Sequence, residues 1–145
     1  MLSITKIFHY EMAHALHHYD GACAAIHGHS YRLEVTVTGP VITDRAHPKC
    51  GMIMDFADLK QVVQTTVLDR FDHALVLNSA VAEDVRTVLE GNYNNVVWVD
   101  YQPTSENLLV DFVSRIQPAL PQGVELIRLR MYETAGSFGE WVNSE

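Results

Sequence analysis

Histidines and a cysteine gather between residues 14 and 29 of this 145-residue chain. His27 and His29 are two positions apart, so in an extended strand their side chains point to the same face. Gly28 between them places no side chain on the opposite face and lets another backbone approach closely. Imidazole nitrogen is a preferred ligand of zinc, and two imidazoles on one strand face can hold one ion. This motif predicts a metal site.

The third ligand follows from the alternation of the neighbouring strands. Residues 2–14 have a mostly apolar even-numbered face that ends at His14, and residues 30–38 have an apolar odd-numbered face. His14, His27 and His29 therefore end the inward faces of two strands that we expect to form a hairpin. Three histidines leave a fourth zinc position open, as in catalytic zinc sites. The other histidines of this region are expected to bind no metal: His9 on the outer face, and His17 and His18 in the connecting loop.

Cys23 precedes His27 by four residues, in a loop that contains Gly21 and three alanines. It has two possible roles beside a metal: a fourth ligand, or a base and nucleophile whose pKa the cation lowers. A small buried hydrophobic residue is the structural alternative. Cys50 lies in a turn-rich segment, residues 39–51, and is expected to have no role.

Asp72 and His73 are adjacent and follow a predicted helix. A carboxylate beside an imidazole can position and polarise a proton carrier, although such residues also commonly end a helix.

Glu133 is the most informative carboxylate of the chain. It shares the parity of the apolar residues Ile127, Leu129 and Met131, so it is predicted to end an inward strand face. A buried carboxylate is costly unless it is paired. We expect either a salt bridge to an arginine or a ligand that presents two parallel N–H donors.

The hydrophobic patterns define the elements that must position these residues. We expect strands over 2–14 and 30–38, a helix over 56–71, a weaker helix over 82–90, a strand over 94–99, a helix over 103–116, and strands over 124–134 and 138–142. No repeated strand–helix–strand pattern is present, which predicts an α+β fold with an antiparallel sheet. The length suits a single domain over residues 1–145.

The composition excludes several classes of protein. It is 48% hydrophobic and 19% charged, as in ordinary soluble globular proteins. No apolar run approaches the roughly 20 residues that cross a bilayer, and no signal peptide is expected. Two cysteines make no disulfide framework, so a reducing cytoplasm is the expected location. A net charge of -8 without a basic tract argues against a nucleic-acid partner.

Several motifs, in this order along nearly the whole chain, resemble the 6-pyruvoyltetrahydropterin and 6-carboxytetrahydropterin synthase family. They are His14 after the first strand, Cys23-x3-His27-Gly28-His29, Gly51-Met52-Ile53-Met54-Asp55-Phe56 with Leu59-Lys60, Asp72-His73, Pro103-Thr104-Ser105-Glu106-Asn107 and Tyr132-Glu133-Thr134. The resemblance implies the tunnelling fold, or T-fold, with elements in ββααββ order and helices packed on one face. It also implies a homo-oligomer, usually a hexamer built as a dimer of trimers whose sheets join around a barrel.

The resemblance also implies roles for individual residues. They are His14, His27 and His29 as Zn²⁺ ligands, Cys23 as the catalytic thiol, Asp72 and His73 as its proton-relay partners, Glu133 as the pterin anchor, and Thr104, Ser105 and Glu106 as lining of the pterin pocket. The implied activity is a zinc-dependent lyase that converts 7,8-dihydroneopterin triphosphate to 6-carboxy-5,6,7,8-tetrahydropterin, with loss of acetaldehyde and triphosphate. Three residues between the cysteine and His-Gly-His resemble the bacterial enzymes of the queuosine route.

Three alternatives remain open from the sequence. The same chemistry could stop at 6-pyruvoyltetrahydropterin, as in tetrahydrobiopterin-type pathways. A pterin- or zinc-binding homologue could lack turnover, although the intact set of reactive residues argues against this. A zinc hydrolase would need a general-base carboxylate near the metal, and the sequence contains no His-Glu-x-x-His motif.

Overall fold

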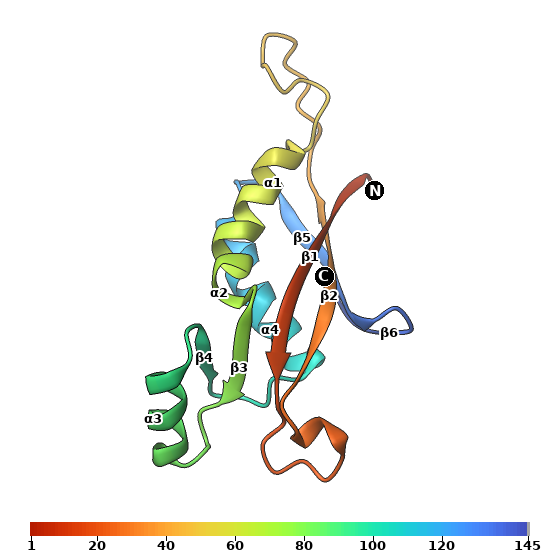
Figure 1. The fold of residues 1–145 in the computed structure, drawn as a ribbon. Coiled ribbons are helices and arrows are strands. Elements are labelled where there is room, and N and C mark those ends of the chain that lie inside the picture. The colour runs from red at the N-terminus through yellow and green to blue at the C-terminus, as the bar shows by residue number, and fades with distance from the viewer. Residues whose placement is uncertain (145) are drawn as a thin grey trace.

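The computed structural model describes residues 1–144, which form a six-stranded sheet in the order β4-β3-β1-β2-β5-β6 (Figure 1). The strands are β1 (Ser3–His14), β2 (His27–Thr38), β3 (Ala74–Asn78), β4 (Val96–Val99), β5 (Glu125–Thr134) and β6 (Ser137–Val142). The helices are α1 (Phe56–Val63), α2 (Asp69–Phe71), α3 (Glu83–Asn92) and α4 (Ser105–Ile116). The predicted α+β class is confirmed.

The sheet is mixed, so the expectation of a purely antiparallel sheet is wrong at one edge. β1, β2, β5 and β6 pair antiparallel as predicted, whereas β3 runs parallel to β1 and β4 runs parallel to β3. α3 supplies the crossover that a parallel pair needs. The sequence reading missed β3 because residues 74–78 are a short apolar run without polar alternation, which periodicity cannot distinguish from a helix end.

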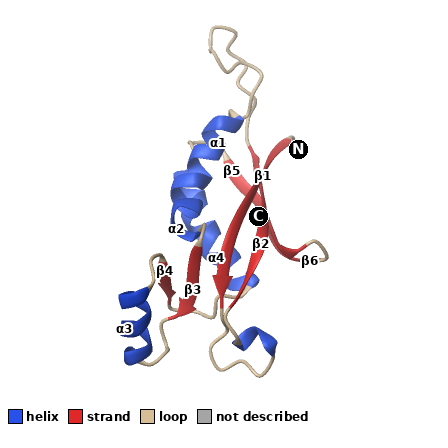
Figure 2. Cartoon of the chain, viewed as in Figure 1, coloured by secondary structure: helices blue, strands red, loops and turns tan. Residues whose placement is uncertain are grey.

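Helices α1, α2 and α4 pack against one face of the sheet, as predicted (Figure 2). The Asp55 carboxylate caps α1 by accepting from the Ala57 N–H at 2.7 Å, and the Thr104 hydroxyl caps α4. The expected helix over 56–71 is one helical run, in which a π-helical turn, Gln64–Leu68, joins α1 to α2. None of the helices within residues 1–144 has the length and apolar character needed to cross a membrane.

The hydrophobic core lies between this helical layer and the inward faces of β1, β2 and β5. Its strand residues follow the predicted parity on the first two strands: Phe8, Tyr10 and Met12 on β1, and Tyr31, Leu33, Val35 and Val37 on β2. Phe112 of α4 joins the layers, because its ring lies 6.5 Å from Tyr10 of β1 and 5.0 Å from Phe71 of α2.

The inward face of β5 changes parity at a bulge. Pairing with β2 shifts between Thr36 and Val37, so Leu126 and Leu129 are both fully buried while Ile127 is only partly buried. A bulge residue adds one position to a strand and exchanges the two faces beyond it. The prediction that Ile127 shares the inward face is therefore wrong, although Leu129 and Met131 point inward as expected.

We predict that Phe112→Ala lowers the free energy of unfolding by about 3–5 kcal/mol, because it removes a fully buried ring that joins three elements. Val88→Ala on α3 is the control, since Val88 is 61% exposed and its loss should change stability by less than about 0.5 kcal/mol. Chemical unfolding at one fixed protein concentration measures both. Similar destabilisation by the two substitutions would contradict this description of the core.

Candidate functional site

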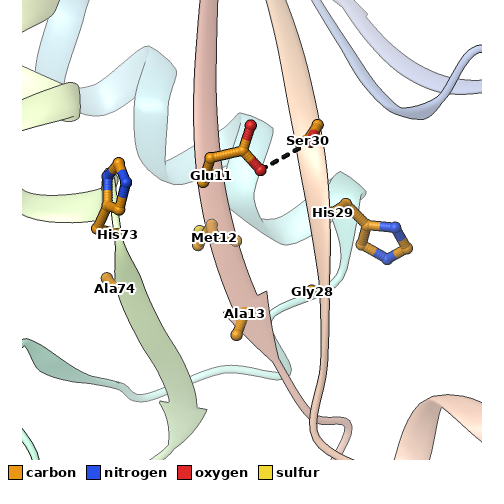
Figure 3. Close-up of a pocket in the computed structure, with 8 residues that line it drawn as sticks. All are labelled: Glu11, Met12, Ala13, Gly28, His29, Ser30, His73 and Ala74. Atoms are coloured by element: carbon orange, nitrogen blue, oxygen red, sulfur yellow. Dashed lines mark hydrogen bonds between the residues drawn. The ribbon is translucent and has the colours of Figure 1, made fainter.

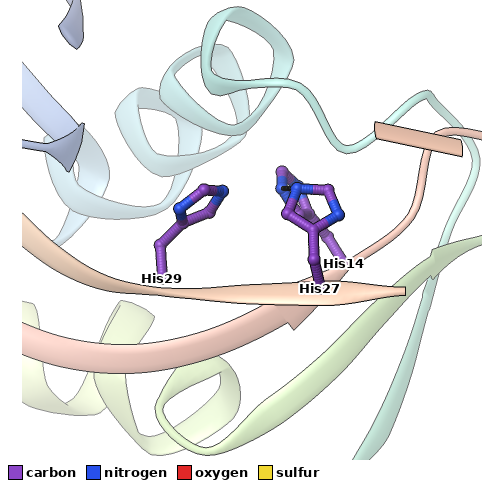
Figure 4. A group of neighbouring side chains, drawn as sticks. All are labelled: His14, His27 and His29. Atoms are coloured by element: carbon purple, nitrogen blue, oxygen red, sulfur yellow. Dashed lines mark hydrogen bonds between the residues drawn. The ribbon is translucent and has the colours of Figure 1, made fainter. Parts of the chain in front are cut away.

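The pairing of β1 with β2 brings three histidines together. His14 lies directly opposite His27 in the ladder, and His29 lies opposite Met12, so all three imidazoles rise from the same face of the hairpin (Figure 4). One potential ligand atom from each residue lies within 4.8 Å of the others. The Nε2 atoms of His14 and His27 are only 3.1 Å apart. The structure thus assembles the three predicted ligands as one cluster.

Backbone carbonyls orient two of these rings. The Nδ1 of His14 donates to the carbonyl of Pro103 at 2.7 Å, and the Nδ1 of His27 donates to the carbonyl of Ala25 at 2.7 Å. Since a carbonyl only accepts, each Nδ1 carries the proton and each Nε2 presents a lone pair. Burial lowers the pKa of His14, which favours the neutral ring that a metal requires.

The cluster fits a metal ion on the chemistry of its donors. Two lone pairs 3.1 Å apart repel each other unless a cation lies between or beside them. The buried Nε2 of His29 has no hydrogen-bond partner within residues 1–144, although a buried polar nitrogen is normally paired. Three neutral nitrogens at this spacing can serve as three ligands of one ion and leave further positions free.

A cavity of about 320 Å³ opens beside the cluster. Its lining includes most of the predicted site residues: His14, Cys23, Thr104, Ser105, Glu106 and Glu133, together with Leu16 and Tyr19. Cys23 is exposed and lies in a short 3-10 turn, Ala22–Ala24, within the loop between β1 and β2. One cavity therefore contains a thiol, a carboxylate and one imidazole of the cluster.

The segment before and at the start of α4 contacts several parts of this cavity. Pro103 accepts the hydrogen bond from His14, Thr104 caps the helix, and the Ser105 hydroxyl donates to Oε1 of Glu133 at 2.7 Å. Glu106 is exposed at the rim. The sequence motif thus holds a histidine of the cluster and the carboxylate in one rigid frame.

Glu133 lies where the pairing of β5 with β6 shifts register, between Tyr132 and Thr134. Its Oε2 is 3.8 Å from Nε2 of His29, and the side chain is 28% exposed. No arginine pairs with it among the described residues, so of the two expected explanations the salt bridge to an arginine is absent there. A carboxylate held by one hydroxyl, with its remaining acceptor capacity facing a cavity, is suited to a ligand with N–H donors.

Asp72 and His73 occupy the opposite side of the hairpin. Their side chains form a close pair, with Nδ1 of His73 2.8 Å from Oδ1 of Asp72. Two hydrogen bonds join the pair to Glu11 of β1: the Glu11 N–H donates to Oδ1 of Asp72, and the His73 N–H donates to the Glu11 carbonyl. His73 lines a second cavity, of about 370 Å³, with Glu11, Gly28, His29 and Ser30, and the ring of His29 points away from the His73 and Glu11 side chains (Figure 3). A single chain therefore does not bring His73 into the cavity of Cys23.

His73 also has a left-handed backbone, with φ of 60°. A non-glycine residue in this region carries strain that the surrounding structure must offset, and such residues cluster at functional sites. The hydrogen bond from the His73 N–H to the carbonyl of Glu11, at 2.6 Å, holds this conformation.

The sequence reading missed two residues beside the site. Tyr31 is fully buried two positions after His29, and its hydroxyl has no partner within residues 1–144. Burial raises the pKa of Tyr31, and the nearby charges of Glu133 and Cys23 raise it further, so the phenol stays protonated. Its inward parity was the available signal. The second is Gln102, whose side-chain amide binds the backbone of His17 in the loop that carries Cys23. It was missed because nothing in a sequence shows a side chain that binds a distant backbone.

Comparison with known proteins gives a consistent assignment. A sequence profile described as 6-pyruvoyl tetrahydropterin synthase matches residues 3–143. The 6-carboxy-5,6,7,8-tetrahydropterin synthase of Haemophilus influenzae is 31% identical over 143 residues, which cover 97% of this chain and 99% of that protein. The enzyme of the same name from Rickettsia felis is 28% identical over 142 residues, with the same coverage of both chains.

Solved structures agree on the fold. The structure of Caenorhabditis elegans 6-pyruvoyl tetrahydropterin synthase matches with a TM-score of 0.70 at 22% identity, covering 99% of this chain and 96% of that one. The chain, whose profile match extends over nearly its full length, belongs to the 6-pyruvoyl tetrahydropterin synthase family.

Proposed function

We propose that this protein is an enzyme that converts 7,8-dihydroneopterin triphosphate to 6-carboxy-5,6,7,8-tetrahydropterin, with loss of acetaldehyde and triphosphate, in a queuosine or deazapurine pathway. The observation that carries the proposal is the cavity in which His14, one of the three clustered histidines, lies with Cys23 and Glu133. The names of the relatives from Haemophilus influenzae and Rickettsia felis support it.

We propose Zn²⁺ as the metal, held by His14, His27 and His29. Three neutral imidazoles with an open position are a typical catalytic zinc ligand set. When bound, the ion supplies Lewis-acid chemistry that stabilises negative charge on side-chain oxygens of the substrate and acidifies the adjacent C–H. No other cofactor is needed for this reaction.

The protein's own residues would bind the pterin and move protons. Glu133 would accept from the 2-amino group and N3–H of the pterin, while Ser105 keeps the carboxylate oriented. Thr104 and Glu106 would line the same pocket. Cys23 as thiolate would carry protons to and from the substrate side chain, and His73, polarised by Asp72, would be the second acid–base group.

Proton transfer by both Cys23 and His73 requires a second copy of the chain. Cys23 and His73 open onto different cavities on opposite sides of one hairpin, so a relay between them needs His73 from a neighbouring subunit. The sheet face not covered by helices is free in a single chain to meet another copy (Figure 2). We therefore propose a homo-oligomer, and a hexamer of two trimers follows from the family resemblance. Both cysteines are unpaired thiols, which suits a reducing cytoplasm.

The second candidate is the 6-pyruvoyltetrahydropterin reaction, in which triphosphate is eliminated without loss of acetaldehyde. The description of the matching family and the C. elegans structure favour it. Both reactions use the same cavity and the same residues, so the geometry supports them equally and the relatives' names favour the first.

Product analysis with Cys23 variants tests the function. Purified enzyme with 7,8-dihydroneopterin triphosphate should release 6-carboxytetrahydropterin and acetaldehyde, identified by mass spectrometry. Cys23→Ala should abolish turnover and keep zinc, because it removes the proton carrier and leaves the histidines intact. Cys50→Ala, the matched control for the other exposed thiol, should keep full activity.

The other outcomes each identify a different reading. A 6-pyruvoyl product would favour the second candidate, and no turnover by the unaltered protein would favour a non-catalytic pterin- or zinc-binding homologue. Loss of zinc in Cys23→Ala would make this thiol a fourth ligand. Full activity in that variant would remove Cys23 from the mechanism.

We predict one zinc per chain, lost in His27→Ala, because that substitution removes one of three ligands and the partner of His14 in the ladder. His9→Ala and His18→Ala are the controls, since both side chains are exposed and lie outside the cluster. Elemental analysis of the purified variants measures the metal. Full zinc in His27→Ala would contradict the ligand assignment.

We predict that Glu133→Gln weakens binding of a non-reactive pterin by about 2–4 kcal/mol, because a charged hydrogen bond is lost and an amide donor then faces a ring donor. Zinc content should stay the same, since Glu133 is not one of the three ligands. Glu140→Gln is the control: Glu140 pairs with Arg130 on the neighbouring strand. Calorimetry decides, and equal affinities of the unaltered protein and Glu133→Gln would make Glu133 a structural carboxylate.

A further inference from the structure

The loop between β1 and β2, residues 15–26, carries Cys23 and has little burial of its own. Residues 18–26 are all exposed. Its internal bonds are few: the Leu16 N–H donates to the carbonyl of Cys23 at 2.8 Å, and short turns close around Ala22–Ala24. Exposed loops with few bonds to their surroundings are the mobile parts of a protein. The position of the thiol therefore depends on what ties this loop to the rest of the chain.

Gln102 provides that tie. Its side-chain amide pairs with both polar groups of the His17 backbone: the His17 N–H donates to Oε1 at 2.9 Å, and Nε2 donates to the His17 carbonyl at 2.6 Å. Within residues 1–144, these two are the hydrogen bonds that join the loop to a segment outside the β1–β2 hairpin. The two residues are 85 positions apart in the sequence.

A neighbour fixes which end of the Gln102 amide faces which group. Asn78 accepts the Ala80 N–H with its Oδ1 at 3.0 Å, so its Nδ2 is the end that donates to Oε1 of Gln102 at 3.2 Å. The Gln102 oxygen thus receives two donors, and its nitrogen is left to meet the His17 carbonyl. Flipping the amide would break all three bonds.

The backbone of Gln102 is anchored at the side of the cavity where His14 of the histidine cluster lies. Its carbonyl accepts from the Thr104 N–H at 2.7 Å and from Nδ2 of Asn107 at 3.0 Å, which attaches it to the start of α4. The next residue, Pro103, accepts from His14. Two adjacent residues therefore contact both parts of the site. The Pro103 carbonyl orients His14, and the Gln102 side chain binds the loop that carries Cys23.

We propose that Gln102 is a positioning residue that sets the distance between the Cys23 thiol and the histidine cluster during turnover. The link runs from the Gln102 amide to His17, and from the adjacent Leu16 N–H to the Cys23 carbonyl. This inference rests on the proposed function, in which Cys23 carries protons. A misplacement of about 1 Å at a reacting group can reduce a rate by up to about a hundredfold.

The test uses full-length Gln102→Ala and Gln102→Glu. The first removes both hydrogen bonds between the Gln102 side chain and the His17 backbone, a pair of bonds that we call the clamp. The second keeps the side-chain volume but replaces the Nε2 donor with an oxygen that repels the His17 carbonyl. Both should lower kcat about 10- to 100-fold while KM changes by less than about threefold, because binding groups stay in place. Zinc content should be unchanged, and amide hydrogen exchange at His17 should become faster.

Gln117→Ala is the matched control. Gln117 also binds a backbone group with its side chain, since its Oε1 accepts from the Leu126 N–H at 3.0 Å, but it lies outside the cavity. Its removal should leave kcat, KM and exchange at His17 unchanged. A comparable loss of kcat there would show that any such clamp matters through stability alone, and would overturn the proposal.

The other outcomes are equally decisive. Unchanged exchange at His17 would show that the clamp does not hold the loop, and faster exchange with full kcat would show that the loop does not position the thiol. Loss of zinc would place the effect at His14 instead. Each of these overturns the role of Gln102 while Cys23→Ala remains inactive. Full activity of Cys23→Ala is the separate result that would overturn the proposed function.

Discussion

The antiparallel register of β1 and β2 is the constraint on which the site depends. Because side chains alternate along a strand, a slip of one residue would turn His14 away from His27 and bury polar residues in the core. The aromatic pair beneath the cluster opposes such a slip: Tyr10 lies opposite Tyr31, and their rings stack at 5.0 Å with planes 12° apart. Core packing thus determines the spacing of the imidazoles.

The same hairpin presents different chemistry on its two faces. The helix-covered face holds the imidazoles and the thiol cavity, and the other face holds the Asp72–His73 pair against Glu11. The sheet separates these two sets, and within one chain neither Asp72 nor His73 lines the cavity that contains Cys23. In the proposed mechanism, Cys23 and His73 can act together only when His73 comes from a second copy of the chain.

The alternation of apolar and polar residues predicted those site residues whose position depends only on the face of their own strand. The faces of β1 and β2 follow from strict alternation, which is why His14, His27 and His29 could be selected and His9 set aside. Residue type alone leaves the cap of α4 open between Thr104 and Ser105, and the structure shows that it is Thr104. Alternation failed at Ile127, because a bulge depends on the partner strand, and at β3, because a short buried run has no polar face. The contact between Gln102 and His17 could not be predicted, because it joins segments 85 positions apart and depends on no repeating pattern in the sequence.

The closeness of the three histidines in sequence bears on the order of folding. All three belong to one hairpin that is complete in the growing chain before the helices are made, and contacts of short sequence separation form first. The Pro103 carbonyl that orients His14, and Glu133 on β5, are synthesised much later. A nascent chain would therefore hold its three imidazoles on one hairpin long before the groups that complete the cavity around them have been made.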